Sequence, residues 1–174
     1  NFRFENKQLR FSKDLKKFFD KELNEREEAF YFYDLSAISQ RFDVFKKSFD
    51  CNIKVHYAMK ANNHPKIMKL FASKDCGVDV VSGGELEEAL KAGFQPEDII
   101  FSGVGKSKKE LTLAIEKQIG QINVESPQEL RRIGELSESL DREVSVAWRM
   151  NPDVNPETHP YIKTGFRENK FGMD

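Results

Sequence analysis

Residues 78–102 read VDVVSGGELEEALKAGFQPEDIIFS and contain the pattern on which the fold prediction rests. The apolar run at 78–82 predicts a strand, and the helical spacing of apolar residues over 84–92 predicts a helix that ends at Gly93. A second apolar run at 99–102 predicts the next strand. A strand, a helix and a strand in this order are typical of a parallel sheet with right-handed crossovers.

The same pattern continues on both sides of this stretch. Further strands are expected at 53–59, 121–124 and 144–150, and further helices at 64–73, 107–118 and 127–140. The expected strands start roughly 22 residues apart, and this even spacing favours a (β/α)8 barrel of the TIM type over a doubly wound sheet. The strands are mostly apolar, which predicts burial on both faces. A closed barrel needs eight strands and about five are visible, so we expect a partial barrel.

The first part of the chain has a different character. Residues 1–29 form a charged segment, with apolar residues at helical spacing between Leu15 and Leu23. Residues 29–33 are aromatic and predict a strand, and 35–49 predict a helix. We therefore divide the chain into an N-terminal charged segment, 1–29, and the partial barrel, 30–174.

Composition excludes several classes of function. The 174 residues carry 28 Lys and Arg against 29 Asp and Glu, a net charge of −1, so no overall field attracts nucleic acid or an anionic membrane. No apolar run approaches the ~20 residues of a membrane span. Cys51 and Cys76 have neither disulfide nor metal-ligand spacing, which favours a cytoplasmic protein without a metal site.

A lysine at the end of a predicted strand is the main candidate for chemistry. Lys60 follows the strand at 53–59, and in a (β/α) barrel the carboxyl ends of the strands form the active-site face. A lysine amine that is shielded from water there can attack an aldehyde. From position alone, a lysine at a strand end is more often a solvated surface charge.

Several motifs in order give this lysine a context. The segment YAMKAN, 57–62, resembles the Y-A-x-K-A-N signature of barrel-type (fold type III) pyridoxal-phosphate (PLP) enzymes. VDVVSGGEL, IFSGVGK, INVES and RMNPDVN follow at 78–86, 100–106, 122–126 and 149–155 in the order of that family. THPYIKTG and ENKFG, at 158–165 and 168–172, are similar to the diaminopimelate decarboxylase family in particular.

The resemblance assigns roles to individual residues. It implies that Lys60 holds PLP as a Schiff base and later carries a proton, and that Ala58 lines the cofactor. Asp79 matches a carboxylate close to the lysine and the cofactor, although it could instead pair with a neighbouring lysine. Arg149 matches an arginine that reaches the phenolic oxygen of PLP, and a surface ion pair is the alternative. His159 and Tyr161 match a loop that covers the site.

The resemblance also implies an activity. It is the PLP-dependent decarboxylation of meso-2,6-diaminopimelate to L-lysine and CO2, carried out by a homodimer whose C-terminal β domain is absent from these 174 residues. We expect this piece alone to be inactive. An arginine or ornithine decarboxylase, an alanine racemase and a non-catalytic regulatory homologue remain alternatives, because the substrate contacts are expected after Asp174.

Overall fold

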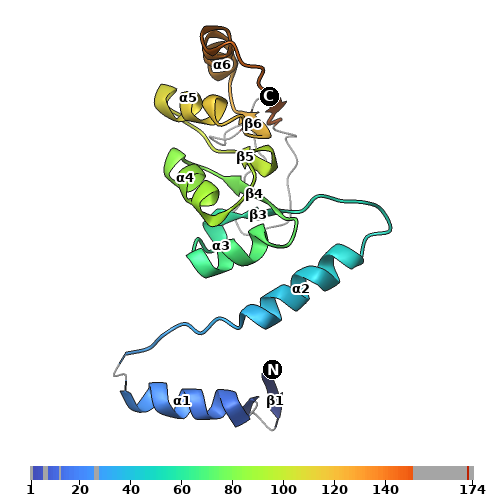
Figure 1. Ribbon diagram of the computed structural model, residues 1–174, viewed down its shortest axis with the longest axis vertical. Helices are drawn as coiled ribbons and strands as arrows, with labels where there is room; N and C mark the ends of the chain where they lie inside the picture. Colours follow the sequence, from blue (N-terminus) through green and yellow to red (C-terminus); the bar gives the residue numbers. More distant parts are fainter. Residues whose placement is uncertain (1, 6–7, 12, 26–27, 151–171, 173–174) are drawn as a thin grey trace. The chain divides into compact units, whose positions relative to one another are not determined.

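The computed structural model describes residues 2–5, 8–11, 13–25, 28–150 and 172. They belong to two compact units, Asn1–Ser48 and Phe49–Asp174. Figure 1 shows the elements of both units along the chain. The predicted loop residues His159 and Tyr161 lie outside the described residues.

The first unit contains a hairpin and two helices. Strands β1 (Phe2–Glu5) and β2 (Gln8–Phe11) pair antiparallel, and helices α1 (Lys13–Glu25) and α2 (Leu35–Lys47) follow. Asp34 caps α2, because its Oδ1 accepts hydrogen bonds from the backbone N–H groups of Ser36 and Ala37 at 2.9 and 3.1 Å.

The prediction of a strand at 29–33 is wrong. This segment pairs with none of the strands that the structure describes. Its side chains nevertheless alternate: the ring of Phe32 lies 4.9 Å from that of Phe19 on α1, whereas Tyr31 is 90% exposed. The aromatic alternation therefore reflects packing on a helix rather than in a sheet.

The second unit is a five-stranded parallel sheet in which each strand lies beside the next one in the chain. The strands are β3 (His56–Ala58), β4 (Gly77–Val80), β5 (Ile99–Phe101), β6 (Gln121–Val124) and β7 (Val146–Trp148). The intervening helices are α3 (Pro65–Ala72), α4 (Gly83–Ala92), α5 (Lys108–Glu116) and α6 (Pro127–Leu140), with short 3-10 turns η1 (Met59–Ala61) and η2 (Pro96–Asp98). The predicted strands and helices of this region are confirmed.

The helices cover one face of this sheet. Figure 1 shows α3 to α6 together on the same side of the strands. A doubly wound sheet has helices on both faces, whereas a (β/α) barrel has them on the outside only. Sequential strand order and one-sided helices are therefore the features of a section of barrel wall.

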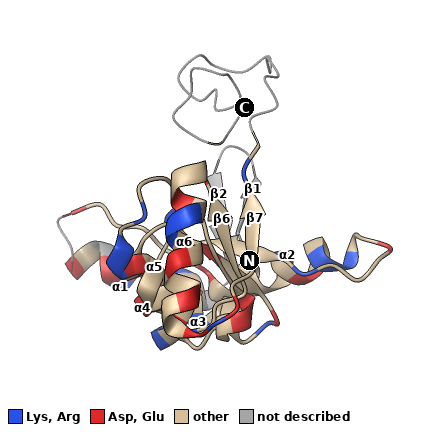
Figure 2. Ribbon diagram, turned by 90° about the horizontal axis from the view of Figure 1, so that it is seen from above, with Lys and Arg blue, Asp and Glu red and all other residues tan. Residues whose placement is uncertain are grey.

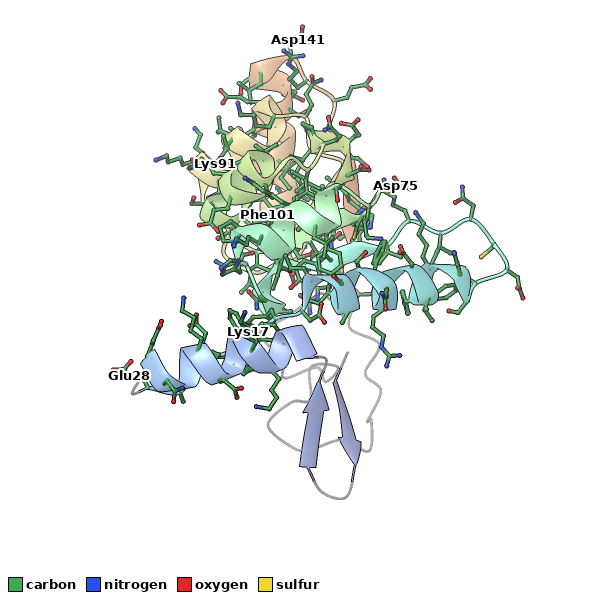
Figure 3. All side chains as sticks on the ribbon, turned by 60° about the horizontal axis from the view of Figure 1, so that its bottom comes forward. Lys17, Glu28, Asp75, Lys91, Phe101 and Asp141 are labelled. Carbon is green, nitrogen blue, oxygen red and sulfur yellow. The ribbon has the colours of Figure 1, made fainter. Side chains whose placement is uncertain are left out.

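The core lies between these helices and the sheet. Val78, Val80, Phe101, Ile122 and Val124 are completely buried. Figure 3 shows Phe101 within the packed elements, while Lys91 and Asp141 lie at the periphery. Since side chains alternate along a strand, the residues between these apolar ones face the other side of the sheet, and several of them are polar. The expected burial on both faces is wrong for β4 and β6, in which Asp79, Gln121 and Asn123 are only half-buried.

Local capping interactions fix where the helices begin and end. Ser82, Ser107 and Ser126 each accept a hydrogen bond from the backbone N–H three residues later, and Gly93 ends α4 at φ 101° as predicted. Glu110 completes a capping box with Ser107 and also accepts a 2.8 Å bond from the backbone N–H of Gly83. Through Glu110, the first turns of α4 and α5 are tied together.

Candidate functional site

A cavity of about 550 Å³ lies where the parallel strands end. Every strand of the sheet, or the turn that follows it, contributes to its wall. The lining residues are Lys60, Asp79, Val81, Ser102, Gly103, Asn123, Trp148, Arg149 and Met150. This size falls within the ~300–1,000 Å³ of small-molecule pockets, and the carboxyl ends of parallel strands are where such folds bind ligands.

Lys60 enters the cavity from a braced turn. It lies in η1 directly after β3, beside Met59, which is completely buried. The hydroxyl of Tyr57 donates to the carbonyl of Asn62 at 3.0 Å and closes the turn. Tyr57 in turn stacks on Phe71 of α3 with ring centroids 4.2 Å apart. Tyr57 therefore links the turn that contains Lys60 to α3.

The Lys60 side chain itself is exposed. This differs from the expected shielding, because β3 is at one edge of the five-stranded sheet and no described strand lies beyond it. Within the described part of the chain, the Lys60 amine makes no hydrogen bond or ion pair. No group in the described residues therefore competes for this amine.

Asp79 faces the same cavity from β4, but it is held from another direction. Its Oδ1 accepts a short hydrogen bond from the hydroxyl of Ser102, which follows β5. Ser102 accepts a 2.9 Å bond from the amide nitrogen of Asn123 on β6, and the Asn123 oxygen accepts a 2.7 Å bond from Gln121. Three neighbouring strands therefore contribute to one polar network beside the cavity.

Arg149 follows β7, and its guanidinium is paired with a buried carboxylate. Its Nη1 donates to Glu125 Oε1 at 2.9 Å, with the Glu125 side chain only 6% exposed. The other Glu125 oxygen accepts a 2.9 Å bond from the backbone N–H of Gly172. Glu125 thus fixes the side of the cavity on which the positive charge lies.

A buried lysine supports the loops next to the cavity. Lys106 is 4% exposed, and its amine donates to the carbonyl oxygens of Gly103 and Asn123 at 2.7 Å each and to Glu129 Oε1 at 3.1 Å. A charge run such as KSKK at 106–109 predicts a solvated helix start. That interpretation is wrong for Lys106, which joins the β5–α5 loop to β6 and α6.

Of the four predicted site residues that the structure describes, the cavity brings three together. Lys60, Asp79 and Arg149 all line it, whereas Ala58, half-buried on β3 and opposite Asp79 in the register, is not among its lining residues. Sequence reasoning missed Ser102 and Asn123. Both lie at carboxyl ends of predicted strands, and that position is the signal that could have identified them.

Other kinds of site find little support in the described residues. Among them, no three His, Cys, Asp or Glu side chains gather in a way that could hold a metal ion. None of their helices combines the length and apolar character of a membrane span. Figure 2 shows acidic and basic residues interspersed along the helices rather than gathered by sign.

The chain is similar to a large group of known proteins. Residues 35–174 match the pyridoxal binding domain of the pyridoxal-dependent decarboxylases. Diaminopimelate decarboxylase from Aquifex aeolicus is 46% identical over 144 residues, which are 83% of this chain and 34% of that protein. The enzyme of the same name from Helicobacter pylori J99 is 44% identical over 83% of this chain and 36% of its own length.

Solved structures give the same result for the fold. The crystal structure of Helicobacter pylori diaminopimelate decarboxylase complexed with L-lysine superposes with a TM-score of 0.83 and 41% identity, over 88% of this chain and 39% of that one. Paramecium bursaria Chlorella virus arginine decarboxylase, at 20% identity and a TM-score of 0.76, shares the fold. The chain spans about a third of the length of its curated relatives. The predicted partial PLP-binding barrel is confirmed.

Proposed function

The chain belongs to the pyridoxal-dependent decarboxylases, and from this premise we propose that the protein decarboxylates meso-2,6-diaminopimelate to L-lysine and CO2. The observation that supports the proposal is the cavity at the strand ends, where no described residue binds the Lys60 amine and a carboxylate and a guanidinium face the same space. The relatives named diaminopimelate decarboxylase, at 42–46% identity, supply the choice of substrate.

The donor set of the cavity suits PLP, the cofactor of this family. The aldehyde of PLP requires a primary amine without a competing partner, and Lys60 provides one. Its phenolic oxygen carries negative charge and suits the Arg149 guanidinium, whose position is set by Glu125 at 2.9 Å. A cavity of about 550 Å³ accommodates a ring of that size.

Each residue then has a defined task. Lys60 would hold the cofactor covalently through its amine, Arg149 would neutralise the phenolic oxygen, and Asp79 would present a carboxylate beside them. When bound, PLP supplies an electron sink for the pair left by the departing carboxylate. The Lys60 amine would also be placed to carry a proton to the α-carbon of the substrate.

Several further assignments belong to this proposal. Ala58 would lie beside the cofactor ring, and His159 and Tyr161 would come from a loop that covers the site. We also propose a homodimer that works in the cytoplasm on a small amino acid, without nucleic acid or membrane as a partner. These assignments follow from the family to which the chain belongs.

Two assays on the complete protein test the proposal. PLP is added, the protein is reduced with borohydride, and peptides are mapped by mass. We expect the pyridoxyl group on Lys60. CO2 release is then compared for meso-diaminopimelate, ornithine and arginine, and racemisation is measured for alanine. Release from another amino acid in place of diaminopimelate would reassign the substrate, and scattered labelling on surface lysines would favour a non-catalytic homologue.

A further inference from the structure

The unpaired state of Lys60 is unexpected, because the carboxylate of Asp79 lines the same cavity. A lysine and an aspartate in one half-buried cavity gain energy by pairing. No ion pair joins them in the described structure, and Asp79 is instead bound to the hydroxyl of Ser102. Something therefore holds the carboxylate away from the amine.

The hydrogen bonds around Asp79 run in one direction. Gln121 donates through Nε2 to Asn123 Oδ1 at 2.7 Å, which turns the Asn123 amide nitrogen toward Ser102. That nitrogen donates to Ser102 Oγ at 2.9 Å. A serine hydroxyl has a single hydrogen, so Ser102, having accepted from Asn123, directs its own hydrogen to Asp79.

We propose that Gln121, Asn123 and Ser102 are positioning residues that engage Asp79 as a hydrogen-bond acceptor and so keep the Lys60 amine free to take up PLP. The inference rests on the proposed function of Lys60. Each of these three residues donates to the next residue, and the last acceptor is the Asp79 carboxylate. This series of hydrogen bonds therefore keeps Asp79 available to the cofactor and prevents it from forming an ion pair with Lys60.

Gln121 allows a test outside the cavity, since it is not among the lining residues. In Gln121→Glu, the new carboxylate can only accept, so the Asn123 amide must rotate and present its oxygen to Ser102. Ser102 then donates to Asn123, and Asp79 is released toward Lys60. Gln121→Met, of similar size, removes the donor without reversing the direction and is the matched control.

The measurement is the rate at which PLP is captured on Lys60 in the complete protein, trapped by borohydride and mapped by mass. We expect Gln121→Glu to lower this rate about 10- to 100-fold, the range for a lost hydrogen bond to a charged group, and Gln121→Met to fall between Gln121→Glu and wild type. Ser102→Ala should resemble Gln121→Glu, and Ser102→Thr, which keeps the hydroxyl, should restore capture. Thermal unfolding of each variant identifies any loss of folding.

A double-mutant cycle separates this effect from general damage. In an Asp79→Asn background no carboxylate remains to pair with Lys60, so Gln121→Glu should lose its effect on capture. Equal rates for Gln121→Glu and Gln121→Met, with Lys60 labelled in the wild type, would overturn the inference and leave the proposed function intact.

Absence of label on Lys60 in the wild type would instead count against the proposed function. Neutron diffraction tests the direction of these hydrogen bonds independently of the labelling of Lys60. A Ser102 hydroxyl deuterium directed at Asp79 supports the inference, and one directed at Asn123 overturns it.

Discussion

Among the described residues around the cavity, Asp79, Arg149 and Lys106 have partners, whereas Lys60 has none. Ser102 binds Asp79, Glu125 binds Arg149, and Glu129 binds Lys106. Because an amine must be free to attack an aldehyde, this difference is what the proposed role of Lys60 requires, and the paired residues define the space in front of it.

Replacing Lys60 should remove activity without affecting the fold. For Lys60→Met we expect CO2 release to fall at least ~100-fold, the lower limit for loss of a positioned acid-base group. Thermal stability without PLP should be unchanged because the side chain is exposed. Lys60→Arg keeps the charge and is the matched control. Activity in Lys60→Arg comparable to wild type would rule out covalent attachment at this residue.

The Glu125–Arg149 pair should contribute more to the site than to stability. Glu125→Ala removes the acceptor of a guanidinium that is 38% exposed and therefore partly solvated, so we expect a loss of only about 1–2 kcal/mol in stability. PLP affinity should fall about tenfold, because the positive charge is no longer fixed at the cavity. Equilibrium titration with PLP and urea unfolding measure the two effects, and Glu125→Gln shows how much of each depends on the charge.

At the scale of elements, helix caps and cross-connections position the loops at the strand ends. Helix boundaries were predicted well from sequence because a cap such as Ser107 with Glu110 is a local signal. The network from Gln121 to Asp79 could not be predicted, because it depends on the register of three strands that are far apart in sequence. The buried state of Lys106 was missed for the same reason.

The link that Glu110 makes between α4 and α5 should depend on pH. The backbone hydrogen bond from Gly83, and then those from Ser107, hold the pKa of Glu110 below its ordinary value of 4.5. A lowered folded-state pKa means that the stabilisation is complete above pH 4.5 and is lost as the pH falls through the folded value. The free-energy difference between wild type and Glu110→Gln should therefore shrink below pH 4.5 in urea unfolding series. Glu116→Gln, on the exposed end of α5, is the matched control.

Lys106 should matter for stability far more than its exposed neighbours. Its side chain is 1% exposed, and Lys106→Ala would leave Glu129 buried without its cation, at a cost of about 3–5 kcal/mol. Lys108→Met, on the exposed first turn of α5, should change stability by less than ~0.5 kcal/mol. Urea unfolding measures the loss of stability in each of the two variants. A small effect of Lys106→Ala would mean that water replaces the amine as the partner of Glu129.

At the scale of the whole molecule, the architecture explains why the reactive residues converge. Parallel strands with helices on one side bring all strand ends to the same face, so residues as distant as Lys60 and Arg149 meet in one cavity. This convergence was predictable from sequence once the strand–helix repeat was recognised. Which polar side chains pair with one another was not predictable, since pairing depends on distances that only the folded backbone fixes.

Because every strand contributes to the cavity wall, binding of PLP should stabilise the whole second unit rather than one loop. A ligand that binds only the folded state at 100 times its Kd adds about 2.7 kcal/mol to the free energy of unfolding. We expect that gain for the complete protein with PLP and a clearly smaller one for Lys60→Met. Trp148 is the single tryptophan of this chain and lines the cavity, so the fluorescence difference between wild type and Trp148→Phe reports occupancy and gives the Kd. If PLP stabilised Lys60→Met as much as wild type, binding would not depend on the covalent link, and Lys60 would act only after the cofactor is in place.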